Sequence, residues 1–107
     1  MKLSNIETVP GYQVKTHYGL VMGSCVVSQT LSKDFMASMK SLRGGEIIEY
    51  TQILDSARKK ALERLTQEAE SLGATGVVGI TFTTSSIMSG SAEVMAYGTA
   101  VELVEGV

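Results

Sequence analysis

Cysteine and histidine are scarce in this chain of 107 residues, which contains one of each, Cys25 and His17. A single Cys excludes an intrachain disulfide and favours a reducing compartment. A structural zinc site takes four nitrogen or sulfur ligands, more than these two residues supply. Tryptophan is absent, and the one proline, Pro10, precedes Gly11 in a predicted turn.

Long apolar runs and an excess of basic residues are also missing. The segment Met1–Asn5 lacks the apolar core of a signal peptide, and no run approaches the roughly 20 apolar residues that span a bilayer. Nine Lys and Arg, scattered from Lys2 to Arg64, face 11 Asp and Glu, giving a net charge of -2. This balance argues against binding driven by phosphate neutralisation. We therefore expect a cytoplasmic protein without nucleic-acid or membrane partners.

The composition is that of a folded protein. Hydrophobic residues make up 44% of the chain and charged residues 19%, which disfavours disorder. The length predicts a single domain covering residues 1–107. A slightly low charged fraction fits a surface that is partly buried between subunits.

The most regular pattern predicts one long helix over Glu46–Leu72. Apolar residues recur along it at steps of three and four, and Gly73 is a natural stop signal. The members of the stripe are Tyr50, Ile53, Leu54, Ala57, Ala61, Leu65, Ala69 and Leu72. Such a helix is roughly 40 Å long, whereas a compact domain of this size is roughly 34 Å across. An elongated subunit packed against neighbours is therefore expected.

The segments before this helix predict two strands and a shorter helix. Alternation over Tyr12–Tyr18 indicates a half-buried strand, Gly19 interrupts it, and Leu20–Val27 indicates a second strand. Gly23 inside that run marks a bulge, a bend or a close backbone approach. Apolar residues at helical spacing over Leu31–Leu42 predict the shorter helix.

The C-terminal third predicts two more strands. Apolar and polar residues alternate over Val78–Thr83, which predicts a strand. The segment Thr84–Ser91 is polar and indicates a long hairpin tip. The return strand, Val94–Val104, has apolar residues at both odd and even positions. Such a strand is buried on both faces, by a helix on one side and, we expect, a second subunit on the other. The predicted fold is α+β, in the order β-β-α-α-β-β, with a mixed or antiparallel sheet of about four strands.

No catalytic constellation is evident. His17 shares its predicted strand face with Gln13 and Lys15, which indicates a solvated polar residue. Cys25 lies in an apolar run and fits a small buried hydrophobe. The glycines at 19 and 23 lack the Gly-Lys-Ser/Thr ending of a P-loop. We therefore expect a protein that is not an enzyme.

Several short motifs together resemble one known family. They are Gly19-Leu20-Val21-Met22-Gly23, Asp34-Phe35-Met36-Ala37, Gly44-Gly45, the Ala57, Ala61, Leu65, Ala69 series, Leu72-Gly73-Ala74-x-x-Val77-Val78-Gly79 and Gly98-Thr99-Ala100-Val101. Their order and spacing are similar to the YbjQ family, described as "putative heavy-metal-binding". The resemblance covers nearly the whole chain. It implies a subunit similar to the dodecin-like fold and assembly into a ring, a homopentamer, without an established activity.

The chain departs from the family pattern at charged positions. Lys33 and Glu46 stand where relatives usually carry Arg, and Thr81, Thr83 and Thr84 replace acidic residues. Arg and Lys are not interchangeable at bidentate sites, so a site built on these charges would be lost or altered here.

Three hypotheses remain open on the sequence. The first is a non-enzymatic homo-oligomer. The second is a metal-binding module in which several subunits contribute Cys25 or His17 to a divalent or soft metal ion. The third is a carrier with small-ligand pockets between subunits, by analogy with flavin-holding dodecins.

Overall fold

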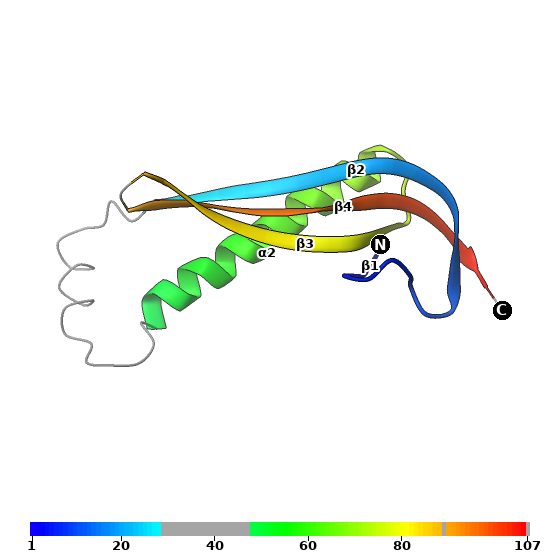
Figure 1. Cartoon of the computed structure of the whole chain (residues 1–107), viewed down its shortest axis with the longest axis horizontal. Coiled ribbons are helices and arrows are strands. Elements are labelled where there is room, and N and C mark those ends of the chain that lie inside the picture. Colours follow the sequence, from blue (N-terminus) through cyan, green and yellow to red (C-terminus); the bar gives the residue numbers. More distant parts are fainter. Residues whose placement is uncertain (29–47, 89, 107) are drawn as a thin grey trace.

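The described part of the chain folds as a long helix against a four-stranded mixed sheet (Figure 1). The computed structural model describes residues 1–28, 48–88 and 90–106. The elements are β1 (Lys2–Leu3), β2 (Tyr12–Ser28), α2 (Ile48–Ser71), β3 (Gly76–Met88) and β4 (Ser91–Glu105). The strand order is β1-β3-β4-β2, with β1 parallel to β3 and the other pairs antiparallel. The α+β class is confirmed, while the predicted helix over Leu31–Leu42 lies outside the described residues.

Helix α2 follows the predicted stripe and ends where glycine allows it. Ala57, Ala61, Leu65 and Ala69 are almost completely buried against the sheet. Gly73 has a φ of 84° and its N–H donates to Glu70, while the N–H of Ala74 donates to Ala69. These two bonds form a Schellman cap, which glycine permits because it has no Cβ to clash in the left-handed conformation.

The helix lies exceptionally close to β2 at Gly23. A Cβ added there would collide with the backbone of Ala61 and Leu65. Across the sheet, Ala96 and Ala100 of β4 are also fully buried beneath the helix. Small side chains on both layers therefore bring α2 into contact with the sheet. Of the three alternatives that the sequence left open at Gly23, the structure shows the close backbone approach.

The first two predicted strands are in fact one strand of 17 residues, β2. Gly19 does not end it, because this glycine takes a φ of 110° at a register shift while pairing with β4 continues on both sides. A second shift lies between Val14 and Thr16. The prediction of two strands was wrong because a bulge absorbs the irregular residues without breaking the ladder. The other N-terminal strand is the unforeseen β1, only two residues long.

The predicted polar hairpin tip was also wrong in length. Strand β3 continues through the Thr and Ser residues to Met88, and β4 resumes at Ser91. Gly90, with a φ of 78°, lies at the turn. Polar residues remain in strand form here because pairing with β4 satisfies their backbone groups while their side chains stay exposed.

Two charged side chains of α2 bind the outer edge of β2. Arg64 Nη1 donates to the carbonyl of Ser24 at 2.6 Å, and Glu68 Oε2 accepts the N–H of Met22 at 3.2 Å. These contacts occupy backbone groups that an edge strand otherwise presents to other chains. Arg64 and Glu68 are four residues apart, a spacing that allows an ion pair along a helix surface, but both side chains bind the strand instead.

The molecule is elongated, as the length of the helix predicted. Its principal extents are 55 × 24 × 16 Å and its radius of gyration is 17.4 Å. A compact domain of this length has a radius of gyration of about 13 Å. Within the described residues, no helix combines the length and apolar character needed to cross a lipid bilayer.

Replacing Gly23 with Ala tests the close approach of the helix. The added methyl group meets helix backbone, which cannot rotate away, so we expect the free energy of unfolding to fall by roughly 1–3 kcal/mol. Urea denaturation at one fixed protein concentration measures the change. The control is Ser24→Ala on the opposite side of the strand, expected within about 0.5 kcal/mol of the unmodified protein. Equal stability of the two variants would contradict the packing described.

Replacing Glu68 with Ala tests the protection of the β2 edge. Loss of a hydrogen bond worth about 1 kcal/mol should speed hydrogen exchange at the Met22 amide by about fivefold. Exchange followed by NMR measures this, with Glu63→Ala as a control because Glu63 forms an exposed ion pair with Lys60 on the helix surface. Exchange at Met22 that is unaffected by the Glu68 change would show that solvent, not the carboxylate, receives this N–H.

Candidate functional site

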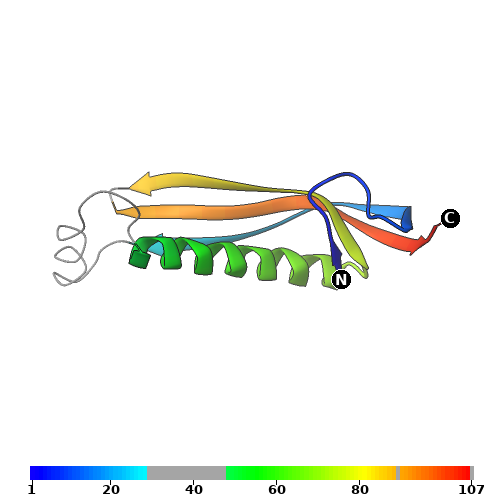
Figure 2. The same cartoon turned by 90° about the horizontal axis from the view of Figure 1, so that it is seen from below.

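The sheet face opposite α2, here named the far face, carries exposed apolar side chains. Val21 and Gly23 of β2 point to the helix, so the alternate residues point away from it. These are Leu20, Met22 and Val26, which are 61%, 45% and 57% exposed. Figure 2 shows α2 as a separate layer on one side of the strands. Nothing comparable covers this part of the far face among the described residues.

Strand β4 is apolar on both faces, as predicted. Val94, Ala96 and Ala100 are buried beneath the helix. Met95 and Tyr97 lie on the far face, where the register pairs them with Ser24 and Met22 of β2. Both are only partly buried in the single chain. Burial of this side by a second subunit stays a prediction.

The segment between β1 and β2 crosses the far face at one end of the sheet (Figure 2). The N–H of Ser4 donates to Val77, the N–H of Gly79 donates to Ile6, and the N–H of Ile80 donates to Ser4, at 2.8–3.0 Å. Here Glu7, Val78 and His17 line one hollow of about 380 Å³, together with Gly79 and Thr99.

His17 is exposed, but not on the face that alternation predicted. The bulge between Val14 and Thr16 inserts one residue, so that His17 pairs with Val101 and Val14 with Leu103. Val101 and Leu103 are two apart in β4, so His17 lies on the face of Val14 and not on that of Gln13. The predicted shared face with Gln13 was wrong because simple alternation does not register an inserted residue.

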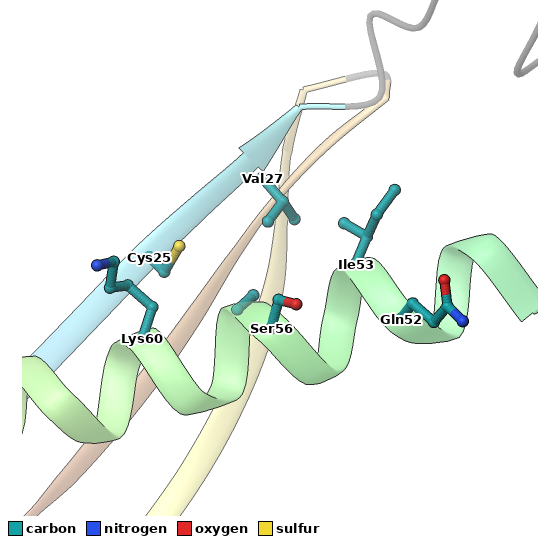
Figure 3. Close-up of a pocket in the computed structure, with 7 residues that line it drawn as sticks. Cys25, Val27, Gln52, Ile53, Ser56 and Lys60 are labelled. Atoms are coloured by element: carbon teal, nitrogen blue, oxygen red, sulfur yellow. The ribbon is translucent and has the colours of Figure 1, made fainter.

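Cys25 lies on the helix side of the sheet and packs against the edge of the core. It is a free, partly buried thiol. Figure 3 shows Cys25 and Val27 of β2 opposite Ile53, Ser56 and Lys60 of α2. These side chains line a largely apolar groove of about 510 Å³. The interpretation of Cys25 as a small apolar packing residue is thus supported, although burial is incomplete.

One subunit does not bring the two predicted metal ligands together. Cys25 pairs with Val94 on the helix side, whereas His17 pairs with Val101 on the far face. Within residues 1–28, 48–88 and 90–106, no group of three or more His, Cys, Asp or Glu side chains could hold a metal ion. A four-ligand soft-metal site therefore does not fit the described part of a single chain.

The departures from the family pattern divide between the two faces of β3. Thr81 and Thr83 pair with Tyr97 and Met95, so they belong to the far face, and Thr84 pairs with Val94 on the helix side. Lys33 and Glu46 lie outside the described residues. The far face of β3 is therefore neutral at two positions where the resemblance implies acidic residues.

Glu7 is the residue of this region that the sequence did not indicate. Its segment has neither helical nor strand periodicity, and its place opposite His17 depends on how the chain folds back after β1. The turn at Pro10-Gly11 was the only local signal. A turn indicates that the chain reverses its direction, but not which residues the segment before it will contact.

Comparison with known proteins places the chain in a family. One similar fold is a crystal structure of a protein of unknown function, of the DUF74 family, from Pediococcus pentosaceus ATCC 25745. It superposes with a TM-score of 0.60 and covers 97% of this chain and 98% of its own. The two sequences are 19% identical, so this likeness shows the fold alone. A UPF0145 protein from Thermotoga petrophila is 52% identical over 103 residues, covering 96% of this chain and 97% of its own length.

A second bacterial relative is similar along almost its whole length. A UPF0145 protein from Thermosipho melanesiensis is 49% identical over 104 residues, covering 97% of this chain and 96% of its own length. The YbjQ family pattern, described as "Putative heavy-metal-binding", matches residues 1–104. The chain belongs to the YbjQ family, also called UPF0145.

Proposed function

We propose that this protein acts as a non-enzymatic subunit of a homo-oligomeric ring, with five subunits as the family resemblance implies, in which neighbouring copies cover the far face. The observation that carries the proposal is the exposure of Leu20, Met22 and Val26 along one side of β2. Apolar side chains that share one exposed surface are typical of protein interfaces.

The total exposed surface supports the same conclusion. A monomeric protein of 11.4 kDa exposes about 5,800 Å², and this chain exposes 6937 Å². The surplus of about 1,100 Å² exceeds the area of about 800 Å² that one standard interface buries on each partner. A net charge of only -2 offers little electrostatic resistance to self-association.

The two edges of the sheet differ, which favours a head-to-tail contact and hence a ring. Strand β1 pairs only with Gly76 and Val77 of β3, so the outer edge of β3 from Thr81 to Met88 has no strand neighbour in the described region. On the other edge, Arg64 and Glu68 occupy part of β2. When two different surfaces of identical subunits contact each other, the subunits form a closed ring if the rotation between neighbours completes a full turn.

The placement of the reactive side chains supports a non-enzymatic role. Nucleophilic catalysis by Cys needs a His within hydrogen-bond reach. Cys25 and His17 lie on opposite faces of β2, so one subunit does not form such a pair.

Replacing Met22 with Lys tests whether the far face is an interface. The charge would have to be buried without a partner, so we expect the oligomer to dissociate. Light scattering coupled to size exclusion should give about 57 kDa for five chains of 11.4 kDa in the unmodified protein and 11.4 kDa for the variant.

The matched control is Leu72→Lys. Leu72 is also 45% exposed, but it follows the C-terminus of α2, away from the far face, and should leave the mass unchanged. A monomeric unmodified protein, or a Met22→Lys variant of undiminished mass, would refute the proposal.

Metal binding by several subunits is the second candidate, and the structure favours one of its two ligands. His17 lies on the far face, where assembly would bring copies closer, whereas Cys25 faces the helix of its own chain. In a multi-subunit site, His17 is therefore the better candidate ligand. The carrier hypothesis places its pockets between subunits, whereas the apolar groove beside Cys25 lies within one subunit.

A further inference from the structure

The outer edge of β3 has a backbone partner over its first part only. Strand β1 pairs with the first two residues of β3, and the carbonyls of Ile6 and Ser4 accept the N–H groups of Gly79 and Ile80. From Thr81 to Met88, β3 pairs with β4 alone within the described part of the chain. Because backbone groups of a strand point alternately to its two sides, every second N–H and C=O of this section points away from the sheet.

The opposite edge of the sheet is protected, and this one is not. Arg64 and Glu68 bind backbone groups at the outer edge of β2. Proteins commonly protect an edge strand with a charged residue, a proline or a bulge. The section Thr81–Met88 contains no charged residue and no proline, and its one register shift, between Ser86 and Met88, lies at the hairpin end. Half of its residues are β-branched, which favours an extended backbone.

Apolar side chains accompany this open edge. Phe82, Ile87 and Met88 are 43%, 51% and 64% exposed. Phe82 pairs with the buried Ala96 and so lies on the helix side of β3. Helix α2 packs mainly against β2 and β4, which leaves Phe82 partly uncovered. A strand added to this edge would therefore bury apolar surface as well as satisfy backbone groups.

We propose that another copy of this chain adds a strand to β3 along Thr81–Met88, so that the sheet continues from one subunit to the next. This inference rests on the proposed homo-oligomer and identifies a second contact between its neighbours, beside the far face. Extended segments bind sheet edges in this way, with affinity from main-chain hydrogen bonds and specificity from side chains. In a head-to-tail ring the added strand is β2 of the neighbour, because β2 is the other edge of the sheet. The contacts of Arg64 and Glu68 with β2 lie at Ser24 and Met22, beyond its first half.

A second copy is the occupant that the observations favour. The neutral section Thr81–Met88 offers no charge that would select an acidic or a basic partner. Every copy carries both edges, so one kind of contact can repeat around a ring. The surplus of exposed surface exceeds what one standard interface buries on each partner, which leaves area for an edge contact in addition to the far face.

Hydrogen exchange of the purified protein, followed by NMR residue by residue, tests this contact, because only copies of the chain can supply the strand there. At a free edge, exchange alternates along the strand, slow where an N–H bonds to β4 and fast where it points to solvent. We expect this alternation over Thr81–Met88 in the separated subunits of the Met22→Lys variant. In the unmodified protein the outward amides should exchange at least about fivefold more slowly, as one hydrogen bond provides.

Replacing Phe82 with Lys tests the same contact through a side chain. A Lys on an edge strand opposes the addition of another strand, so this variant should restore fast exchange of the outward amides. Leu72→Lys is the matched control, because Leu72 is 45% exposed against 43% for Phe82 and follows the C-terminus of α2. Exchange along β3 in this control should remain as slow as in the unmodified protein.

Mass and exchange rate together separate this inference from the proposed ring. If light scattering shows an oligomer while exchange over Thr81–Met88 still alternates, strand addition is refuted and the ring stands. Slow exchange of the outward amides in separated Met22→Lys subunits would also overturn the inference, because residues of the same chain would then protect the edge. A monomeric unmodified protein would refute both the ring and the edge contact.

Discussion

Close contact between α2 and the sheet determines which side chains the core can hold. Gly23 in β2 faces the backbone of the helix at Ala61 and Leu65, and no larger residue fits there. Because the layers approach so closely, the core between them consists mainly of Ala and Val side chains around Leu65. The packing density of such an interface leaves little room for substitution.

This arrangement leaves the two faces of the sheet with different roles. The helix and the small residues of β4 form the core on one side, while Met95 and Tyr97 of the same strand join Met22 on the other. Among the described residues, α2 covers one face of the sheet and leaves apolar side chains of β2 exposed on the other. The two side chains that the sequence singled out as metal ligands are also on different faces, because Cys25 lies on the helix side and His17 on the far face.

The sequence predicted best where a regular period met no interruption. The α2 stripe, its end at Gly73 and the two apolar faces of β4 follow directly from side-chain spacing. The face of His17 was mispredicted because the bulge between Val14 and Thr16 reverses the parity of the strand until a second register shift, between His17 and Gly19, restores it. The hairpin was mispredicted because pairing with β4 overrides the low strand preference of a polar Ser-rich segment. Glu7 could not be placed at all, since its position depends on contacts distant in sequence.

If neighbouring copies cover the far face, as we propose, Met22 is shielded from solvent, and its oxidation rate reports that shielding. Met22 is 45% exposed in the single chain, and hydrogen peroxide oxidises methionine in proportion to its accessibility. Peptide mass spectrometry can follow this residue in the native protein and in the chain unfolded in urea. We expect Met22 to oxidise far more slowly in the native protein than in the unfolded chain. Equal rates in the two states would show that the far face is open to solvent and not covered by neighbouring copies.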